Sequence, residues 1–136
     1  MSERTNPTVY AGLTYADALA AIAWLEAVGF ERRELHADEN DPSHVLHAEY
    51  AWGPRGAIMF GSKRRENPDG FVDTVGHGQA YCVTQTDEEV DAAYDRAMAA
   101  GATSLRPPED MPYGGRGATV LDPEGNQWSF GSYPGS

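Results

Sequence analysis

The segment that decides the fold reads TYADALAAIAWLEAVGF and runs from Thr14 to Phe30. Asp17 is suited to cap the start of a helix, because its carboxylate accepts a free backbone N–H of the first turn, and Gly29 is suited to end it. Between them the apolar residues recur every three or four positions. They are Ala18, Ala21, Ile22, Leu25 and Val28. The sequence therefore predicts a helix that buries one face.

The same pattern returns later in the chain, in residues 86–102, which read TDEEVDAAYDRAMAAGA. Thr86 and Glu89 form a capping box, and Gly101 ends the run. The apolar stripe of this second helix consists of Val90, Ala93, Tyr94, Ala97 and Met98. When Gly29 is aligned with Gly101 the two stripes superimpose, which indicates an internal repeat.

Strand-like runs rich in β-branched and aromatic residues flank each helix in the same order. They are Thr8–Tyr15, Glu31–Ala37, Val45–Trp52 and Ala57–Ser62 around the first helix, and Gly78–Thr84, Thr103–Arg106, Gly117–Leu121 and Gln127–Tyr133 around the second. Residues 107–115 follow no regular pattern. We predict one α+β domain over residues 1–136, built from two βαβββ modules at 8–62 and 76–133 that are joined by a linker at 63–75.

Side chains of a half-covered strand alternate between a core face and a second face. In Val45–Trp52 the expected core set is Leu46, Ala48, Tyr50 and Trp52, which leaves Val45, His47, Glu49 and Ala51 on the second face. Met59 and Ser129 likewise oppose the core in their strands. Such mixed second faces are typical of a ligand cleft, and an ordinary solvent-facing sheet has the same appearance. Trp128 is expected in the core, and Trp24, off its helix stripe, is expected to be partly exposed.

The composition excludes several classes of function. The formal net charge of −11, with 10 Lys and Arg against 21 Asp and Glu, disfavours a nucleic-acid partner, and the basic run Lys63-Arg64-Arg65 is too short to reverse that. No apolar stretch reaches the roughly 20 residues of a membrane span, and residues 1–8 do not form an export signal. We expect a cytoplasmic protein in which the single cysteine, Cys82, is a buried thiol.

Four stretches carry a resemblance to a known family: TYADA at 14–18, VGF at 28–30, MPYGGR at 111–116 and DPEGNQW at 122–128. They resemble the vicinal-oxygen-chelate superfamily, which contains glyoxalase I, the bleomycin-resistance proteins and dioxygenases. The last stretch is similar to the family's DP-(D/E)-GN turn before its final strand. The resemblance covers residues 8–133 and implies two βαβββ modules paired into a cupped mixed sheet around a ligand cavity.

Metal-dependent members of this superfamily hold a divalent ion through His, Gln or Glu at four strand positions. The resemblance places these positions at Tyr10, at Met59, at Gln79 or His77, and at Ser129. Tyr, Met and Ser with at most one His or Gln do not supply the converging ligands that a divalent ion requires. We therefore expect no metal and no cofactor, and the resemblance points to the metal-free, bleomycin-resistance-like branch.

The residues expected to contact a ligand lie at or beside those positions, on the mixed strand faces, or in the glycine-containing loop 112–116. They are Tyr10, His47, Glu49, Met59, Gln79, Tyr81, Tyr113, Arg116 and Ser129. His47 and Glu49 share a strand face, so the pair is suited to hydrogen-bond a ligand or to act as general acid and base. His36 and His44, near loop ends, are expected in solvent.

The sequence favours a binding protein over an enzyme. We expect a small-molecule-binding protein that sequesters or carries a drug-like organic ligand such as an antibiotic, without metal chemistry. The resemblance implies a homodimer with ligand clefts near the interface. Two alternatives stay open: a glyoxalase-type lyase or dioxygenase that depends on a metal or on His47 and Glu49, and an interaction module without a small-molecule ligand.

Overall fold

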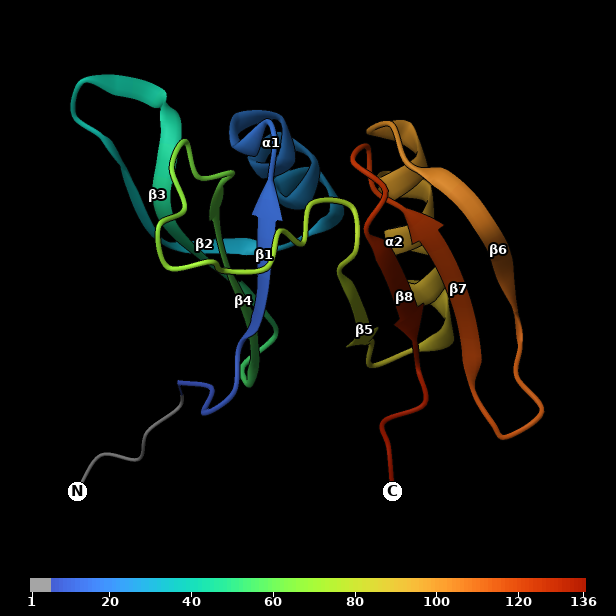
Figure 1. The fold of residues 1–136 in the computed structure, drawn as a ribbon. Coiled ribbons are helices and arrows are strands. Elements are labelled where there is room, and N and C mark those ends of the chain that lie inside the picture. Colours follow the sequence, from blue (N-terminus) through green and yellow to red (C-terminus); the bar gives the residue numbers. More distant parts are fainter. Residues whose placement is uncertain (1–5) are drawn as a thin grey trace, which may run out of the picture.

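The chain folds into two copies of the same βαβββ unit (Figure 1). The computed structural model describes residues 6–136. The expectation that residues 1–8 form no export signal therefore lies largely outside the described residues. The first unit contains β1 (Ala11–Tyr15), α1 (Ala18–Val28), β2 (Glu31–Asp38), β3 (Asp41–Trp52) and β4 (Gly56–Ser62). The second contains β5 (Gln79–Val83), α2 (Asp87–Ala99), β6 (Thr103–Asp110), β7 (Arg116–Leu121) and β8 (Gln127–Gly131).

Each unit forms its own four-stranded mixed sheet, in the order β1-β4-β3-β2 and β5-β8-β7-β6. The first strand of each unit runs parallel to the last, with Ala11 opposite Ile58 and Gln79 opposite Gln127, and the other pairs are antiparallel. The predicted α+β class and the repeated unit are confirmed. The eight strands divide into two sheets and do not form one continuous sheet.

The helices and the inner faces of both sheets share one hydrophobic core. α1 packs against β1 and β3, α2 packs against β6, β7 and β8, and the helices contact each other. The Phe30 ring bridges the units, with its centroid 5.0 Å from that of Trp52 and 5.4 Å from that of Trp128. Because both inner faces belong to this core, the outer faces of the two sheets point away from it and do not face each other.

Trp24 lies at the contact between the two helices. Its side chain is 2% exposed, its Nε1 donates to the Ala97 carbonyl oxygen at 3.2 Å, and its ring centroid is 6.0 Å from that of Trp128. The expectation of partial exposure for Trp24 is wrong, because α2 covers a second side of α1. The expectation that Trp128 lies in the core is confirmed, since it is 1% exposed.

β3 carries a bulge that reverses the expected alternation near its start. The pairing of β3 with β2 shifts between His47 and Val45, which leaves Leu46 without a partner residue. Val45 is 1% exposed and Leu46 is 59% exposed. The assignment of Leu46 to the core and of Val45 to the second face is therefore wrong, because one inserted residue moves the alternation by one step.

Two strands extend a full four residues beyond the ranges that the sequence indicates. β3 begins at Asp41, and β6 continues past the predicted end at Arg106 to Asp110. The added part of β6 contains Pro107 and Pro108, at a shift in the register with β7. β6 lies at the edge of its sheet, where proline's missing N–H removes no essential ladder hydrogen bond.

The turn between β7 and β8 fastens the two units together through Asp122. This carboxylate is 4% exposed, and its Oδ2 accepts the Tyr15 hydroxyl at 2.9 Å and the Trp128 indole N–H at 3.0 Å. Burial, and then the nearby charge of Asp122, raise the pKa of Tyr15 far above its ordinary value. Since Tyr15 ends β1, a side chain of the second unit anchors the first.

Glu124 of the same turn makes a second connection. Its carboxylate oxygens accept the backbone N–H groups of Ala16 and Asp17, both at 2.7 Å. Asp17 in turn caps α1 by accepting the Ala20 N–H at 3.1 Å. The DPEGN stretch thus fixes the start of the first helix.

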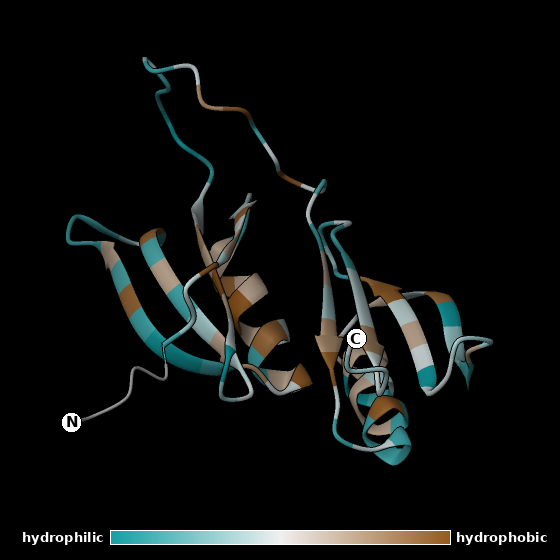
Figure 2. Cartoon of the chain, turned by 90° about the horizontal axis from the view of Figure 1, so that it is seen from below, coloured by the Kyte–Doolittle hydropathy of each residue, from teal (hydrophilic) through white to brown (hydrophobic). Residues whose placement is uncertain are grey.

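The segment between the units leaves the body of the molecule and returns to it. Figure 2 shows this connection projecting to one side, with hydrophilic and hydrophobic stretches in succession. Across residues 6–136 no helix has the length and apolar character needed to cross a membrane.

Candidate functional site

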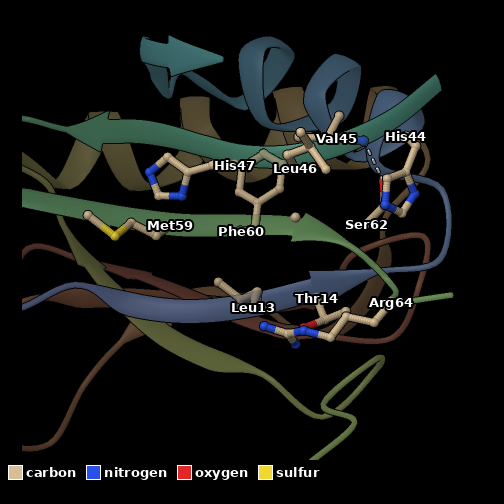
Figure 3. A pocket seen from close by; sticks show the side chains of 11 residues that line it. Leu13, Thr14, His44, Val45, Leu46, His47, Met59, Phe60, Ser62 and Arg64 are labelled. Carbon is tan, nitrogen blue, oxygen red and sulfur yellow. Dashed lines mark hydrogen bonds between the residues drawn. The ribbon is translucent and has the colours of Figure 1, made fainter. Parts of the chain in front are cut away.

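A cleft with a volume of about 340 Å³ lies against the first sheet (Figure 3). Strands β1, β3 and β4 and the chain just after β4 line it. The lining residues are Leu13, Thr14, His44, Val45, Leu46, His47, Met59, Phe60, Gly61, Ser62 and Arg64. Figure 3 shows His47 and Met59 at one end of this cleft and His44, Ser62 and Arg64 at the other. The cleft therefore has an apolar middle and polar ends.

Two glycines shape the outer face of the sheet at this cleft. A Cβ added at Gly12, which lies opposite Met59, would meet no atom within 4 Å. A Cβ at Gly61 would lie 3.0 Å from the carbonyl oxygen of Leu46 and 3.1 Å from that of Val45. Gly61 thus allows the bulged part of β3 to approach β4 closely, and this bulge forms one wall of the cleft.

His47 and Glu49 form a hydrogen-bonded pair at one end of the cleft. The distance from Nε2 to Oε2 is 2.7 Å, and the side chains are 42% and 24% exposed. On the neighbouring strand His36 stacks on His47 with ring centroids 6.2 Å apart, and His36 lies 3.3 Å from Glu34. The carboxylate orients the His47 ring, which leaves one ring nitrogen to donate to or accept from a ligand.

Met59 lies directly opposite Glu49 and is half-buried in the cleft. Tyr10 is half-buried immediately before β1 and, by alternation from Gly12, lies on the same outer side of the sheet. It lies outside the set of residues that line the cleft.

The predicted residues of the second unit lie on the other sheet. Tyr81 is opposite Ser129, and Ser129 Oγ is 2.8 Å from Thr119 Oγ1. The Tyr81 hydroxyl donates to the Tyr133 carbonyl oxygen at 2.7 Å, and partial burial raises the pKa of Tyr81. The Tyr113 ring packs edge-on against Tyr133 with centroids 5.2 Å apart. These side chains form a polar and aromatic surface away from the 340 Å³ cleft.

Arg116 is held by acidic neighbours. Its Nε donates to Asp91 of α2 at 2.8 Å, and its Nη1 lies 3.5 Å from Asp110. The hydrogen bond to Asp91 raises the pKa of Arg116. Its guanidinium is therefore engaged with the helix that covers the inner face of the second sheet.

The sequence-predicted site residues thus form two groups, one on each sheet. His47 and Met59 line the cleft, and Glu49 hydrogen-bonds to His47. Thr14, Arg64 and His44 also line the cleft, although the sequence did not indicate them, and His44, expected in solvent, is half-buried. Arg64 follows the end of β4 by two residues, and this position is the one feature of the sequence that could have indicated it as a cleft residue.

Within one chain, the four positions at which this fold family binds a metal do not come together. Met59 lies in the first sheet and Tyr10 just before β1, while Gln79 and Ser129 lie in the second sheet, and the two outer faces do not meet within the chain. His77 is exposed just before β5. Among residues 6–136, no three side chains of His, Cys, Asp or Glu are grouped so as to hold a metal ion.

Comparison with solved structures gives the same fold. TioX from Micromonospora sp. ML1 is 28% identical, with 90% of this chain and 97% of that chain covered and a TM-score of 0.67. A glyoxalase-related enzyme from Fulvimarina pelagi is 22% identical, with 91% and 87% covered and a TM-score of 0.67.

Similarity in sequence extends to mycobacteria. Uncharacterised proteins of Mycobacterium bovis and Mycobacterium tuberculosis are 41% identical over 54 residues, or 40% of this chain. The matched segment spans about a third of the length of those relatives, 36% and 32% respectively. A model of the Glyoxalase/Bleomycin resistance protein/Dioxygenase superfamily matches residues 7–130. The chain therefore belongs to the Glyoxalase/Bleomycin resistance protein/Dioxygenase superfamily.

Proposed function

We propose that this protein binds a small organic molecule in the cleft of the first unit and sequesters or carries it without metal chemistry. The cleft supports this proposal through its form, an apolar middle with polar groups at both ends, which is typical of small-molecule sites. Its volume of about 340 Å³ is at the lower end of the range of drug-binding pockets, roughly 300–1,000 Å³. We propose an antibiotic or a related secondary metabolite as the ligand, because the superfamily that matches residues 7–130 includes bleomycin-resistance proteins.

A homodimer belongs to the same proposal. The outer face of the second sheet exposes Tyr81 and Val83, at 46% and 43%, and Leu46 beside the cleft is 59% exposed. If a second copy places its second sheet over the first sheet of its partner, these apolar groups become buried. Such a dimer also brings Tyr81 and Ser129 of one copy over the cleft of the other, so that the two groups of predicted residues meet.

Equilibrium binding tests the proposal. A panel of antibiotics is titrated into the purified protein and into Thr14→Trp, which fills the cleft with an indole ring. Thr103→Trp places the same ring on an exposed position of the other sheet and is the matched control. We expect saturable binding of at least one compound, weakened about ten-fold or more by Thr14→Trp and unchanged by Thr103→Trp. Absence of any saturable ligand would contradict the proposal.

A separate experiment tests the proposal that the protein works without a metal ion. Elemental analysis of the purified protein is expected to find no stoichiometric Ni, Zn, Mn or Fe. Near-equimolar metal would place the chain with the metal-dependent enzymes of the superfamily.

The hydrogen-bonded pair of His47 and Glu49 favours a second candidate, acid–base catalysis on the bound molecule. A carboxylate at 2.7 Å fixes the orientation of the ring, as in general-base pairs. Glu49→Gln keeps the shape and removes the charge. If the ligand is turned over, this variant is expected to bind it with unchanged affinity and to convert it more slowly. Unchanged turnover would exclude the pair as catalyst.

A further inference from the structure

The charge of the cleft is opposite to the charge of the chain. The sequence holds 21 acidic and 10 basic residues, yet the ionisable side chains that line the cleft are all bases. They are His44, His47 and Arg64. Of the carboxylates near the cleft, Glu49 is hydrogen-bonded to His47, and Asp73 lines the adjoining hollow, where it pairs with Lys63. A cationic group at one end of the cleft attracts an anionic group of a ligand.

Arg64 is the residue of its basic run that has no carboxylate partner within the described chain. Lys63 lies 3.3 Å from Asp73, and Arg65 pairs with Asp38 and Asp41. Over residues 6–136 no carboxylate oxygen lies within 4.0 Å of the Arg64 guanidinium, whereas both of its neighbours are paired. The charge of Arg64 is therefore available to a ligand.

An aromatic ring positions this guanidinium. Its central carbon lies 4.4 Å from the centroid of the Phe71 ring, which belongs to the linker. Stacking on a ring uses one face of the guanidinium and leaves its N–H edge free for a planar anion. Arg64 and Thr14 line both the main cleft and an adjoining hollow of about 90 Å³, so the group lies at the point where the two meet.

The same end of the cleft offers hydroxyl groups. Ser62 Oγ accepts the Val45 N–H at 2.8 Å, which leaves its hydroxyl proton to donate elsewhere. Thr14 supplies a second hydroxyl on the wall. Between this end and His47 the lining is apolar, with Leu13, Phe60 and Met59 in Figure 3.

We infer that the cleft selects an organic acid: a compact apolar body that carries one anionic oxygen group, such as a carboxylate, which binds the guanidinium of Arg64. This inference rests on the proposed function and names the ligand class of the same site. Arg64 acts as a specificity residue, and the acidic remainder of the protein surface does not attract the ligand.

Two probes of equal shape test the inferred preference for an organic acid: 2-naphthoate, which carries a carboxylate, and 2-naphthamide, which is neutral. Each is titrated into ¹⁵N-labelled protein at pH 7.5, and amide shifts give both the Kd and the location. We expect the shifts to map to Leu13, Phe60 and Gly61, and 2-naphthoate to bind about five-fold or more tightly than 2-naphthamide.

Variants separate charge from shape. Arg64→Gln is expected to remove the preference while 2-naphthamide binds as before, and Arg64→Lys is expected to keep part of it, because a point charge remains without the planar fork. Arg55→Gln removes the same charge at an exposed turn between β3 and β4 and is expected to change nothing. The spectra themselves report whether each variant is folded.

Three outcomes would overturn the inference in distinguishable ways. Equal affinities of the wild-type protein for the two probes would remove charge selection and leave the cleft as a binding site. A preference that survives in Arg64→Gln would assign it to another group. Binding of neither probe at these residues would contradict the inference, whereas the proposed function falls only if the antibiotic titrations also find no saturable ligand.

Discussion

Cys82 shows how burial alone sets the chemistry of a side chain. It is 5% exposed on β5, opposite Phe130, and the loss of solvent raises the pKa of its thiol from 9.0 to about 12. The apolar run around Cys82 predicted a buried thiol, and the structure confirms the burial. A thiol in this state is neither a nucleophile nor a metal ligand at neutral pH.

The raised pKa of Cys82 predicts that the stability of the protein depends on pH. Folding favours the protonated thiol, so its contribution to the free energy of unfolding is complete below pH 9 and is lost as the pH rises from 9 towards 12. Tyr50, with its pKa raised to about 12 by burial and by Glu26, adds a loss above pH 10. Urea titrations of the wild type and of Cys82→Ala across this range are expected to converge as the pH rises. A constant difference would contradict the prediction.

At the scale of elements, helices were predictable and the details of strands were not. Asp17 and Thr86 cap α1 and α2 as expected, because capping depends on residues three positions apart in sequence. The bulge at Leu46 and the prolines inside β6 depend on pairing with a neighbouring strand, which one sequence does not reveal. The alternation rule assumes regular pairing, and it fails where the pairing shifts.

The bulge supports a test with two glycines. Gly61→Ala places a Cβ about 3.0 Å from two backbone carbonyl oxygens, which cannot move aside like a flexible side chain, so the free energy of unfolding is expected to fall by about 1–3 kcal/mol. Gly12→Ala, with open space around it, is expected to change it by less than about 1 kcal/mol. Urea denaturation measures both. Equal losses of stability for the two variants would show that the close approach of β3 to Gly61 does not require a glycine.

At the scale of the whole molecule, the two units depend on each other. The sequence predicted the repeat and the DPEGN turn, but not that the turn joins the units, because Asp122 and Tyr15 are far apart in the chain. The candidate site likewise depends on contacts between distant residues, which the sequence does not reveal. His47 and Met59 follow from alternation along a strand, whereas Arg64 reaches the cleft from a linker without regular pattern, and only the folded chain brings these residues together.

Removing the buried carboxylate tests this dependence. Asp122→Ala leaves the Tyr15 hydroxyl and the Trp128 N–H without their acceptor, so the free energy of unfolding is expected to fall by about 3 kcal/mol or more. Asp95→Ala, an exposed position on α2, is expected to change it by less than about 0.5 kcal/mol. A loss for Asp122→Ala no larger than that control would mean that the turn does not hold the units together.

The location of Arg64 has a consequence for how such proteins diversify. Arg64 is the second residue of the connection that follows β4, whereas the residues that hold the units together are buried in the core. If Arg64 selects the ligand as we infer, exchange of a few residues in that connection would invert the charge of the accepted ligand at little cost to folding. The charge at the cleft end would then vary independently of the strands and helices that form the scaffold.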